Sequence, residues 1–312
     1  MVDDFIRPFQ IESAGIRGRM VRMGPLVDEI LQRHDYPEPV SRLLGQALAL
    51  TSVLASALKF DGVFTLQTKG DGAVPLMVAD YRSPGLMRGY AQYDGEALDA
   101  AVEAAPEGGP PSVPRLMGSG YIAFTVDQGS QKDRYQGIVE LEGATLADCV
   151  HAYFRNSEQL DSAIRVAVDE TEDDAGGRSW RAGAIMLQRL PEGDPGMMAR
   201  GAEYERDEVS EEDWRRAVTL MATARDEELI NPDLAPDELL YRLYHEDGVR
   251  VFDGVPLRAG CRCSEHRAEV VLSSLPKTEL ADLAVEGELT VTCEFCNATY
   301  RFALNQFMDD ED

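Results

Sequence analysis

The sequence predicts an α+β protein in three parts: a mixed α/β body over residues 1–192, an acidic helical linker over 193–248, and a small cysteine-rich domain over 249–312. Three observations predict this division. Strand-like and helix-like segments are mixed over the first ~190 residues, acidic residues become dense after Pro191, and four of the five cysteines fall in the last 52 residues. An apolar content of 44% is ordinary for a folded protein.

The body contains three strand-like segments and one long helix. Segments 15–23, 62–68 and 120–126 are strand-like, and the turn signals Asp61–Gly62 and Asp71–Gly72 lie at strand ends, so these segments are predicted to be strands. Apolar residues recur close to a 3.6-residue period between Val40 and Lys59, which predicts a helix. Because only Arg42 and Lys59 are charged in that helix, we expect it to be buried against a sheet.

A second helix of the body is predicted to begin near Thr145. Thr145 and Asp148 have the spacing of a capping box, in which each side chain accepts a hydrogen bond from the other residue's backbone. Cys149 lies on the side of this helix expected to face the core. We interpret it as a small buried hydrophobe, because Asp148 beside it opposes the lowered pKa that a reactive thiol needs.

The linker is the most acidic part of the chain. Residues 192–248 hold 17 acidic residues and 6 arginines, a net charge of −11. Ser210 is a suitable N-cap for a helix that we expect to end at Asn231–Pro232, with one face formed by Trp214, Ala217, Val218 and Met221. A shorter helix begins at Pro236 and carries Leu239, Leu240, Leu243 and Tyr244. These helices either lie on another surface or form a solvated spacer.

The C-terminal cysteines have the spacing of a structural metal site. Cys261 and Cys263 are separated by one residue, 29 residues follow, and Cys293 and Cys296 are separated by two. Four thiolates form the tetrahedral shell preferred by structural Zn²⁺. The alternative is four ordinary buried thiols, which two close pairs in a segment with little core disfavour.

Two histidines are alternative ligands, and neither is expected to bind metal. His266 and His245 lie near the cysteines in sequence, but four sulfurs already complete the shell. A closed shell leaves no position for water or substrate, so we expect no metal-catalysed hydrolysis. The sequence also has no phosphate-binding loop, Gly-x-Ser-x-Gly or His-Glu-x-x-His, and we expect no enzymatic activity.

Thiolate ligands also make such a site sensitive to oxidants. Peroxide can convert a thiolate to a sulfenic acid, and a neighbouring thiol can then close a disulfide. Each disulfide removes two ligands, so oxidation should expel the metal. Metal binding contributes about 10–16 kcal/mol to small zinc modules, so its loss should unfold residues 249–312 and could loosen the linker helices.

Charge and hydropathy limit the classes of binding partner and the cellular compartment that we expect. The net charge of −26 and a pI near 4.5 argue against nucleic acid and anionic membranes, which bind clustered Lys and Arg. No apolar run approaches the ~18–20 residues that span a bilayer, and the acidic N-terminus is unlike a signal peptide. We therefore expect a cytoplasmic protein.

Several segments together resemble the bacterial 33-kilodalton redox-regulated heat-shock chaperones. Cys261–Ser264 and Cys293–Asn297 are similar to the zinc centre of that family. Further segments match in family order: Leu58–Gly62, Arg134–Gly137, Tyr153–Leu160 and Arg242–Glu246. Two features depart from the family pattern, namely His266 in place of an arginine and the strongly acidic linker.

The resemblance implies a holdase, a chaperone that binds unfolding client proteins without ATP. It implies that one Zn²⁺ is held by Cys261, Cys263, Cys293 and Cys296 in an inactive reduced form. Oxidation would form the disulfides Cys261–Cys263 and Cys293–Cys296, release zinc, unfold the C-terminal region and yield a homodimer. The linker helices, about 205–245, would cover an apolar face of the body until then.

The sequence also allows an alternative function. The C-terminal domain could be a zinc-ribbon interaction module, fused to an α/β domain, that binds a protein or nucleic acid. Residues 249–312 contain 6 basic and 12 acidic residues, a net charge of −6, which opposes nucleic-acid binding.

Overall fold

The computed structural model describes the chain in segments: residues 3–106, 110–129, 134–153, 161–172, 176–189 and 211–308. It separates into two compact units, residues 1–259 and 260–312. The predicted cap Ser210 and the predicted boundary between 192 and 193 lie outside the described residues.

The first sheet of the N-terminal unit is antiparallel. Its order is β10-β1-β2-β9-β8, and β11 also pairs with β1. The strands are β1 (Phe5–Ile11), β2 (Ile16–Met23), β8 (Ser162–Glu172), β9 (Arg178–Arg189), β10 (Val249–Val251) and β11 (Val255–Pro256). The register places Phe9 opposite Gly18, and Arg22 opposite Gly183. We call this sheet A.

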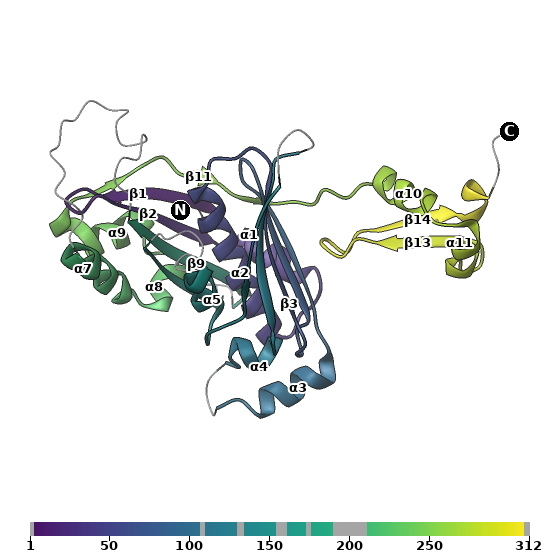
Figure 1. Ribbon diagram of the computed structural model, residues 1–312, viewed down its shortest axis with the longest axis horizontal. Coiled ribbons are helices and arrows are strands. Elements are labelled where there is room, and N and C mark those ends of the chain that lie inside the picture. Colours follow the sequence, from purple (N-terminus) through teal and green to yellow (C-terminus); the bar gives the residue numbers. More distant parts are fainter. Residues whose placement is uncertain are drawn as a thin grey trace. The chain divides into compact units, whose positions relative to one another are not determined.

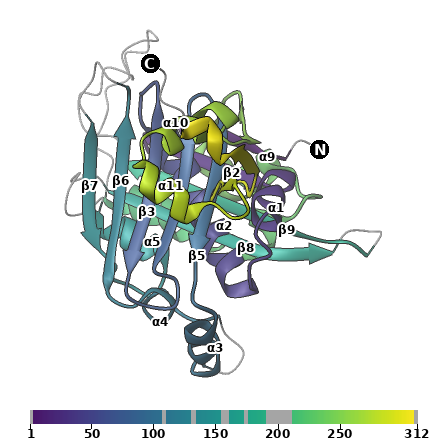
Figure 2. The same cartoon turned by 90° about the vertical axis from the view of Figure 1, so that its right-hand side faces the viewer.

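The second sheet of this unit, sheet B, has the order β12-β5-β4-β3-β6-β7. Its strands are β3 (Val63–Gly70), β4 (Leu76–Arg82), β5 (Leu86–Gln92), β6 (Gly120–Asp127), β7 (Tyr135–Glu140) and β12 (Arg258–Ala259). Strands β3 to β7 are antiparallel, and β12 joins the edge in parallel with β5. Figure 2 shows β7, β6, β3 and β5 across this sheet. The three predicted strands thus correspond to β2, β3 and β6.

Helix α2 (Glu38–Ala57) forms the layer between the two sheets (Figure 1). It contacts β2, β8 and β9 of sheet A as well as β3, β4 and β5 of sheet B. Contrary to the expectation from the sequence, this helix is long and apolar enough to cross a membrane, but 78% of its most apolar 18-residue stretch is buried inside the protein. The predicted helix over 40–59 is therefore confirmed as a core helix.

The other helices in the described part of the body are short. They are α1 (Pro25–Gln32), α3 (Gly95–Glu103), α4 (Val113–Met117) and α5 (Leu146–Tyr153). The capping box predicted for α5 is present: the Asp148 carboxylate accepts from the Thr145 N–H at 2.9 Å, and Thr145 Oγ1 accepts from the Asp148 N–H at 3.2 Å. Cys149 is buried, as predicted.

The linker helices cover the face of sheet A opposite α2 (Figure 1). They are α7 (Glu211–Ala222), α8 (Asp226–Ile230) and α9 (Pro236–Tyr244), followed by η2 (His245–Asp247). Their apolar residues form a second core with Phe9, Ile16 and Met20. Residues 211–244 are therefore packed on the body and are not a solvated spacer.

One helix boundary in the linker differs from the sequence prediction. The first helix ends at Ala222 instead of continuing to Asn231–Pro232. A new helix, α8, follows because the Glu228 carboxylate accepts a hydrogen bond from the Arg225 backbone N–H at 2.8 Å.

The C-terminal unit begins later than the expected boundary at residue 249. Residues 249–259 form β10, β11 and β12, which pair with β1 and β5 of the body. The unit from Gly260 onward contains α10 (Glu265–Ser273), α11 (Lys277–Leu283), β13 (Glu288–Thr292), β14 (Thr299–Ala303) and η3 (Leu304–Phe307). Its core among the described residues is small: Ala268, Leu272, Leu280, Leu289 and Phe302.

Candidate metal centre

The first pair of cysteines lies in the segment that leads into α10. Ser264 caps this helix, since its side chain accepts a hydrogen bond from the Arg267 N–H at 3.2 Å. The Arg267 guanidinium donates back to the Arg262 carbonyl at 2.8 Å. These contacts hold the Cys261–Cys263 turn against the start of the helix.

The second pair lies in the turn between β13 and β14. The strands pair from Glu288↔Ala303 to Thr292↔Thr299, so the turn spans residues 293–298. The Cys293 N–H donates to the Ala298 carbonyl at 2.9 Å, and the Asn297 N–H donates to the Cys293 carbonyl at 2.8 Å. Asn297 has a φ of +57°, a left-handed conformation that asparagine tolerates well. The turn therefore presents both sulfurs on one side.

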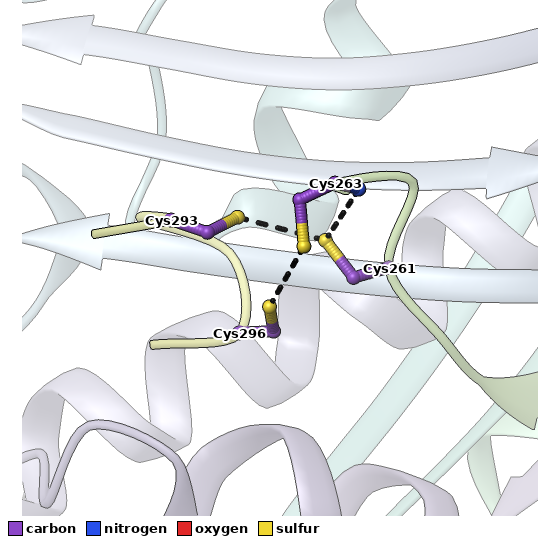
Figure 3. A group of neighbouring side chains, drawn as sticks. All are labelled: Cys261, Cys263, Cys293 and Cys296. Carbon is purple, nitrogen blue, oxygen red and sulfur yellow. Dashed lines mark hydrogen bonds between the residues drawn. The ribbon is translucent and has the colours of Figure 1, made fainter. Parts of the chain in front are cut away.

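The four sulfurs converge, as Figure 3 shows. All four Sγ atoms lie within 4.8 Å of one another. The Sγ atoms of Cys261 and Cys293 are 3.6 Å apart, and those of Cys263 and Cys296 are 3.3 Å apart. A tetrahedron with metal–sulfur bonds of about 2.3 Å has edges of about 3.8 Å, so this donor set fits a tetrahedral metal ion.

The thiols do not ionise independently at these distances. Burial raises the pKa of Cys296 to about 12 and also raises that of Cys293. At Cys261 burial acts in the same direction, but the Cys263 N–H and the neighbouring thiols outweigh it and the pKa falls to about 6. The first thiolate therefore forms readily, whereas ionisation of further thiols is unfavourable. A divalent cation bound to the sulfurs would compensate their negative charge and so favour the ionised thiolates.

Tyr300 contributes a group to this centre that the sequence analysis missed. Its hydroxyl donates a hydrogen bond to Cys263 Sγ at 3.2 Å. This hydrogen bond, together with burial and the nearby sulfurs, raises the pKa of Tyr300 to about 12, so the hydroxyl remains protonated. The alternation of β14 could have indicated it, because Phe302 on the same face enters the core.

His266, His245 and the fifth cysteine, Cys149, make contacts of their own. The His266 side chain is 82% exposed and pairs with Glu269 at 3.5 Å. His245 follows α9 in the N-terminal unit, where its Nδ1 is 3.1 Å from the Tyr241 carbonyl oxygen. Burial raises the pKa of Cys149 to about 11, with a further contribution from Asp148, and so disfavours its thiolate. Among the described residues, the group of sulfurs that could hold a metal ion consists of Cys261, Cys263, Cys293 and Cys296.

Two buried arginines of sheet A hold the linker on the body. Arg22 is 1% exposed, and its guanidinium donates to the carbonyl oxygens of Glu228 and Leu229 at 3.1 Å and to that of Leu234. Arg181 donates to the Ile230 carbonyl at 2.6 Å. The last carbonyls of a helix lack partners within it, and here the arginines of β2 and β9 supply them.

Close backbone packing accompanies these hydrogen bonds. A Cβ atom on Gly183 would lie 2.5 Å from the Leu229 carbonyl oxygen, so α8 can approach the sheet only over a glycine. Glu228 on α8 is buried and is bonded by Arg242 of α9, which lowers the pKa of this carboxyl to about 2. The linker is thus anchored through α8, both to the sheet and to α9.

Comparison with known proteins gives a consistent result. A family model described as Hsp33 protein matches residues 4–303. The 33 kDa chaperonin of Caulobacter vibrioides is 42% identical over 302 residues, covering 96% of this chain and 95% of that protein. The protein of the same name from Pseudomonas paraeruginosa is 38% identical, covering 94% of this chain and 90% of its own length.

A solved structure shares the fold. The crystal structure of the 33 kDa chaperonin, a heat shock protein 33 homologue, from Thermotoga maritima aligns with a TM-score of 0.78 at 23% identity. The alignment covers 98% of this chain and 97% of that one.

Proposed function

Because this chain belongs to the Hsp33 family, whose model spans residues 4–303, we propose that it is a redox-regulated, ATP-independent chaperone. It would hold unfolding client proteins during oxidative stress. The observation that carries the proposal is the convergence of four oxidisable sulfurs within 4.8 Å in a unit with a small core. The relatives named 33 kDa chaperonin support the chaperone class.

In the reduced protein, Cys261, Cys263, Cys293 and Cys296 would hold one Zn²⁺. When bound, the ion supplies a cross-link between the segment before α10 and the turn between β13 and β14. A module of this size buries too little apolar surface to be stable by that alone. The four thiolates therefore determine whether the C-terminal unit is folded.

Peroxide would convert these thiolates to disulfides. A thiolate attacks the peroxide and becomes a sulfenic acid, and a second thiolate displaces hydroxide from it to form the S–S bond. The proposed products are Cys261–Cys263 and Cys293–Cys296. The sulfur distances of 3.6 Å and 3.3 Å each join a cysteine of one pair to a cysteine of the other pair. The proposed pairing therefore depends on the family resemblance and needs mapping by mass spectrometry.

Unfolding of the C-terminal unit would then release the linker. The chain between α9 and Cys261 is held to the body by three strands of only two or three residues. Departure of α7, α8 and α9 would uncover the apolar face of sheet A around Phe9, Ile16 and Met20. We propose that clients bind when this face is uncovered, in the cytoplasm, and that the oxidised protein is a homodimer without nucleic-acid partners.

The test is a peroxide titration that follows zinc release and light scattering from a heat-aggregating client together. We expect both to change over the same range of peroxide concentration. A Cys149→Ser protein is the matched control and should behave like the wild type, since that thiol is buried in the body. A Cys261→Ser/Cys263→Ser protein that still required oxidant would contradict the proposal, and a salt-sensitive shift with DNA or RNA would favour the interaction module.

A further inference from the structure

We propose that the Tyr300 hydroxyl is a positioning group of the metal centre, which holds the Cys263 sulfur and slows its oxidation. This inference rests on the proposed metal site and does not depend on chaperone activity. The carrying observation is the hydrogen bond of 3.2 Å from the Tyr300 hydroxyl to Cys263 Sγ.

The bond joins two parts of the C-terminal unit that are distant in sequence. Cys263 lies just before α10, whereas Tyr300 lies in β14 opposite Val291. The Tyr300 ring also packs against the small core that contains Phe302. The hydroxyl is therefore held in place by the hairpin and is not a freely rotating surface group.

Cys263 receives its hydrogen bond from a side chain that mutation can alter. Backbone N–H groups of the two cysteine turns are hydrogen-bonded to the other three sulfurs: that of Cys263 to Cys261, those of Phe295 and Cys296 to Cys293, and that of Ala298 to Cys296. No side-chain substitution other than proline removes those backbone donors. Replacing the Tyr300 hydroxyl changes one sulfur and leaves the backbone intact.

The chemical effect follows from the charge of the centre. Four thiolates with one divalent cation leave two negative charges, which hydrogen-bond donors help to disperse. A donor to sulfur also withdraws electron density from the atom that must attack peroxide. In that attack the thiolate sulfur takes one peroxide oxygen to become a sulfenic acid, and hydroxide leaves. Tyr300 should therefore both strengthen metal binding and slow the first oxidation at Cys263.

The experiment uses the full chain with Tyr300→Phe, which keeps the packed ring and removes only the hydroxyl. Tyr241→Phe, on an exposed ring of α9 in the other unit, is the matched control. With Co²⁺ as the probe, we expect a shift of the thiolate-to-cobalt charge-transfer band in Tyr300→Phe alone. Chelator competition with Zn²⁺ should show an affinity about tenfold lower, the usual effect of losing a hydrogen bond to a ligand.

Oxidation and alkylation locate the effect on one sulfur. Under dilute peroxide, zinc release from Tyr300→Phe should be several-fold faster than from the wild type, and Cys263 should be alkylated faster while Cys296 is unchanged. A 3-fluorotyrosine at position 300, a stronger donor, should shift the band in the opposite direction and provides the test if Tyr300→Phe does not fold.

An unchanged band, affinity and release rate would overturn the inference. Wild-type protein that fails to suppress client aggregation, while Tyr300→Phe still shows the shifts, would refute the proposed function and leave the role of Tyr300 intact.

Discussion

Replacing Arg22 with methionine should release the linker from the body without any oxidant. The substitution retains an apolar chain of similar length in a strand that the linker covers. It removes the guanidinium that donates to the carbonyl oxygens of Glu228, Leu229 and Leu234. Those carbonyls can regain partners only if α8 moves away from the sheet into water.

The magnitude follows from the contacts. A hydrogen bond that involves a charged group contributes about 1.5–3 kcal/mol net, and a buried polar group left without a partner costs about 1–3 kcal/mol. The three bonds share one guanidinium, whose burial is itself unfavourable, so their contributions do not add. We expect a loss of about 2–4 kcal/mol in linker docking, which is about 30-fold to about 1,000-fold in the equilibrium between docked and released linker.

Native-state hydrogen exchange of the reduced protein measures this equilibrium directly. Amides of α7, α8 and α9 should lose protection in Arg22→Met by that factor, while those of β3 and β4 should not. Arg250→Met is the matched control, because Arg250 makes an exposed ion pair with Glu12 at 3.1 Å, and such pairs contribute about 0–1 kcal/mol. Full protection of the linker in a folded Arg22→Met protein would refute the anchoring role of this arginine.

Three further results are expected. Gly183→Ala would place a Cβ atom 2.5 Å from the Leu229 carbonyl oxygen, so hydrogen exchange of the α8 amides should accelerate at least tenfold. An unchanged exchange rate would show that α8 need not approach the sheet so closely. The hydrogen bond from Arg242 holds the pKa of Glu228 at about 2, below the 4.5 of an unperturbed carboxyl. The ionised Glu228 carboxylate therefore contributes fully to linker stability above pH 4.5, and this contribution is lost as the pH falls toward 2. Hydrogen exchange of the linker amides should accelerate over that pH range in the wild type and not in Glu228→Gln. Metal removal by a chelator under reducing conditions should make residues 260–308 sensitive to protease, and a resistant fragment would mean that the sulfur centre does not hold this unit together.

Sequence reasoning succeeded where the determinants are local. The capping box of α5 needs only Thr145 and Asp148 at a fixed spacing, and both hydrogen bonds are present. The periodic apolar residues of α2 likewise identify a buried helix, although not the two sheets that enclose it. The spacing of the four cysteines indicated a common site, and their sulfurs do converge.

Features whose determinants are distant in sequence could not be predicted from the sequence. Arg22 lies in a strand, where a charged residue is usually exposed, and only the docked linker explains its burial. Strands β10 to β12 are too short to have a pattern and exist because β1 and β5 offer edges. The role of Tyr300 requires the fold of the hairpin, which brings its hydroxyl to a cysteine 37 residues earlier.

The anchoring of α8 has a consequence for how the linker can diverge among relatives. Arg22 and Arg181 bind main-chain carbonyl groups, which every amino acid provides. Side chains pointing away from the body can therefore be exchanged, and charge accumulated, without weakening this attachment. Substitutions on the outward face of the linker helices can therefore change the solubility of the linker and the ease of its release, while Arg22 and Arg181 stay the same.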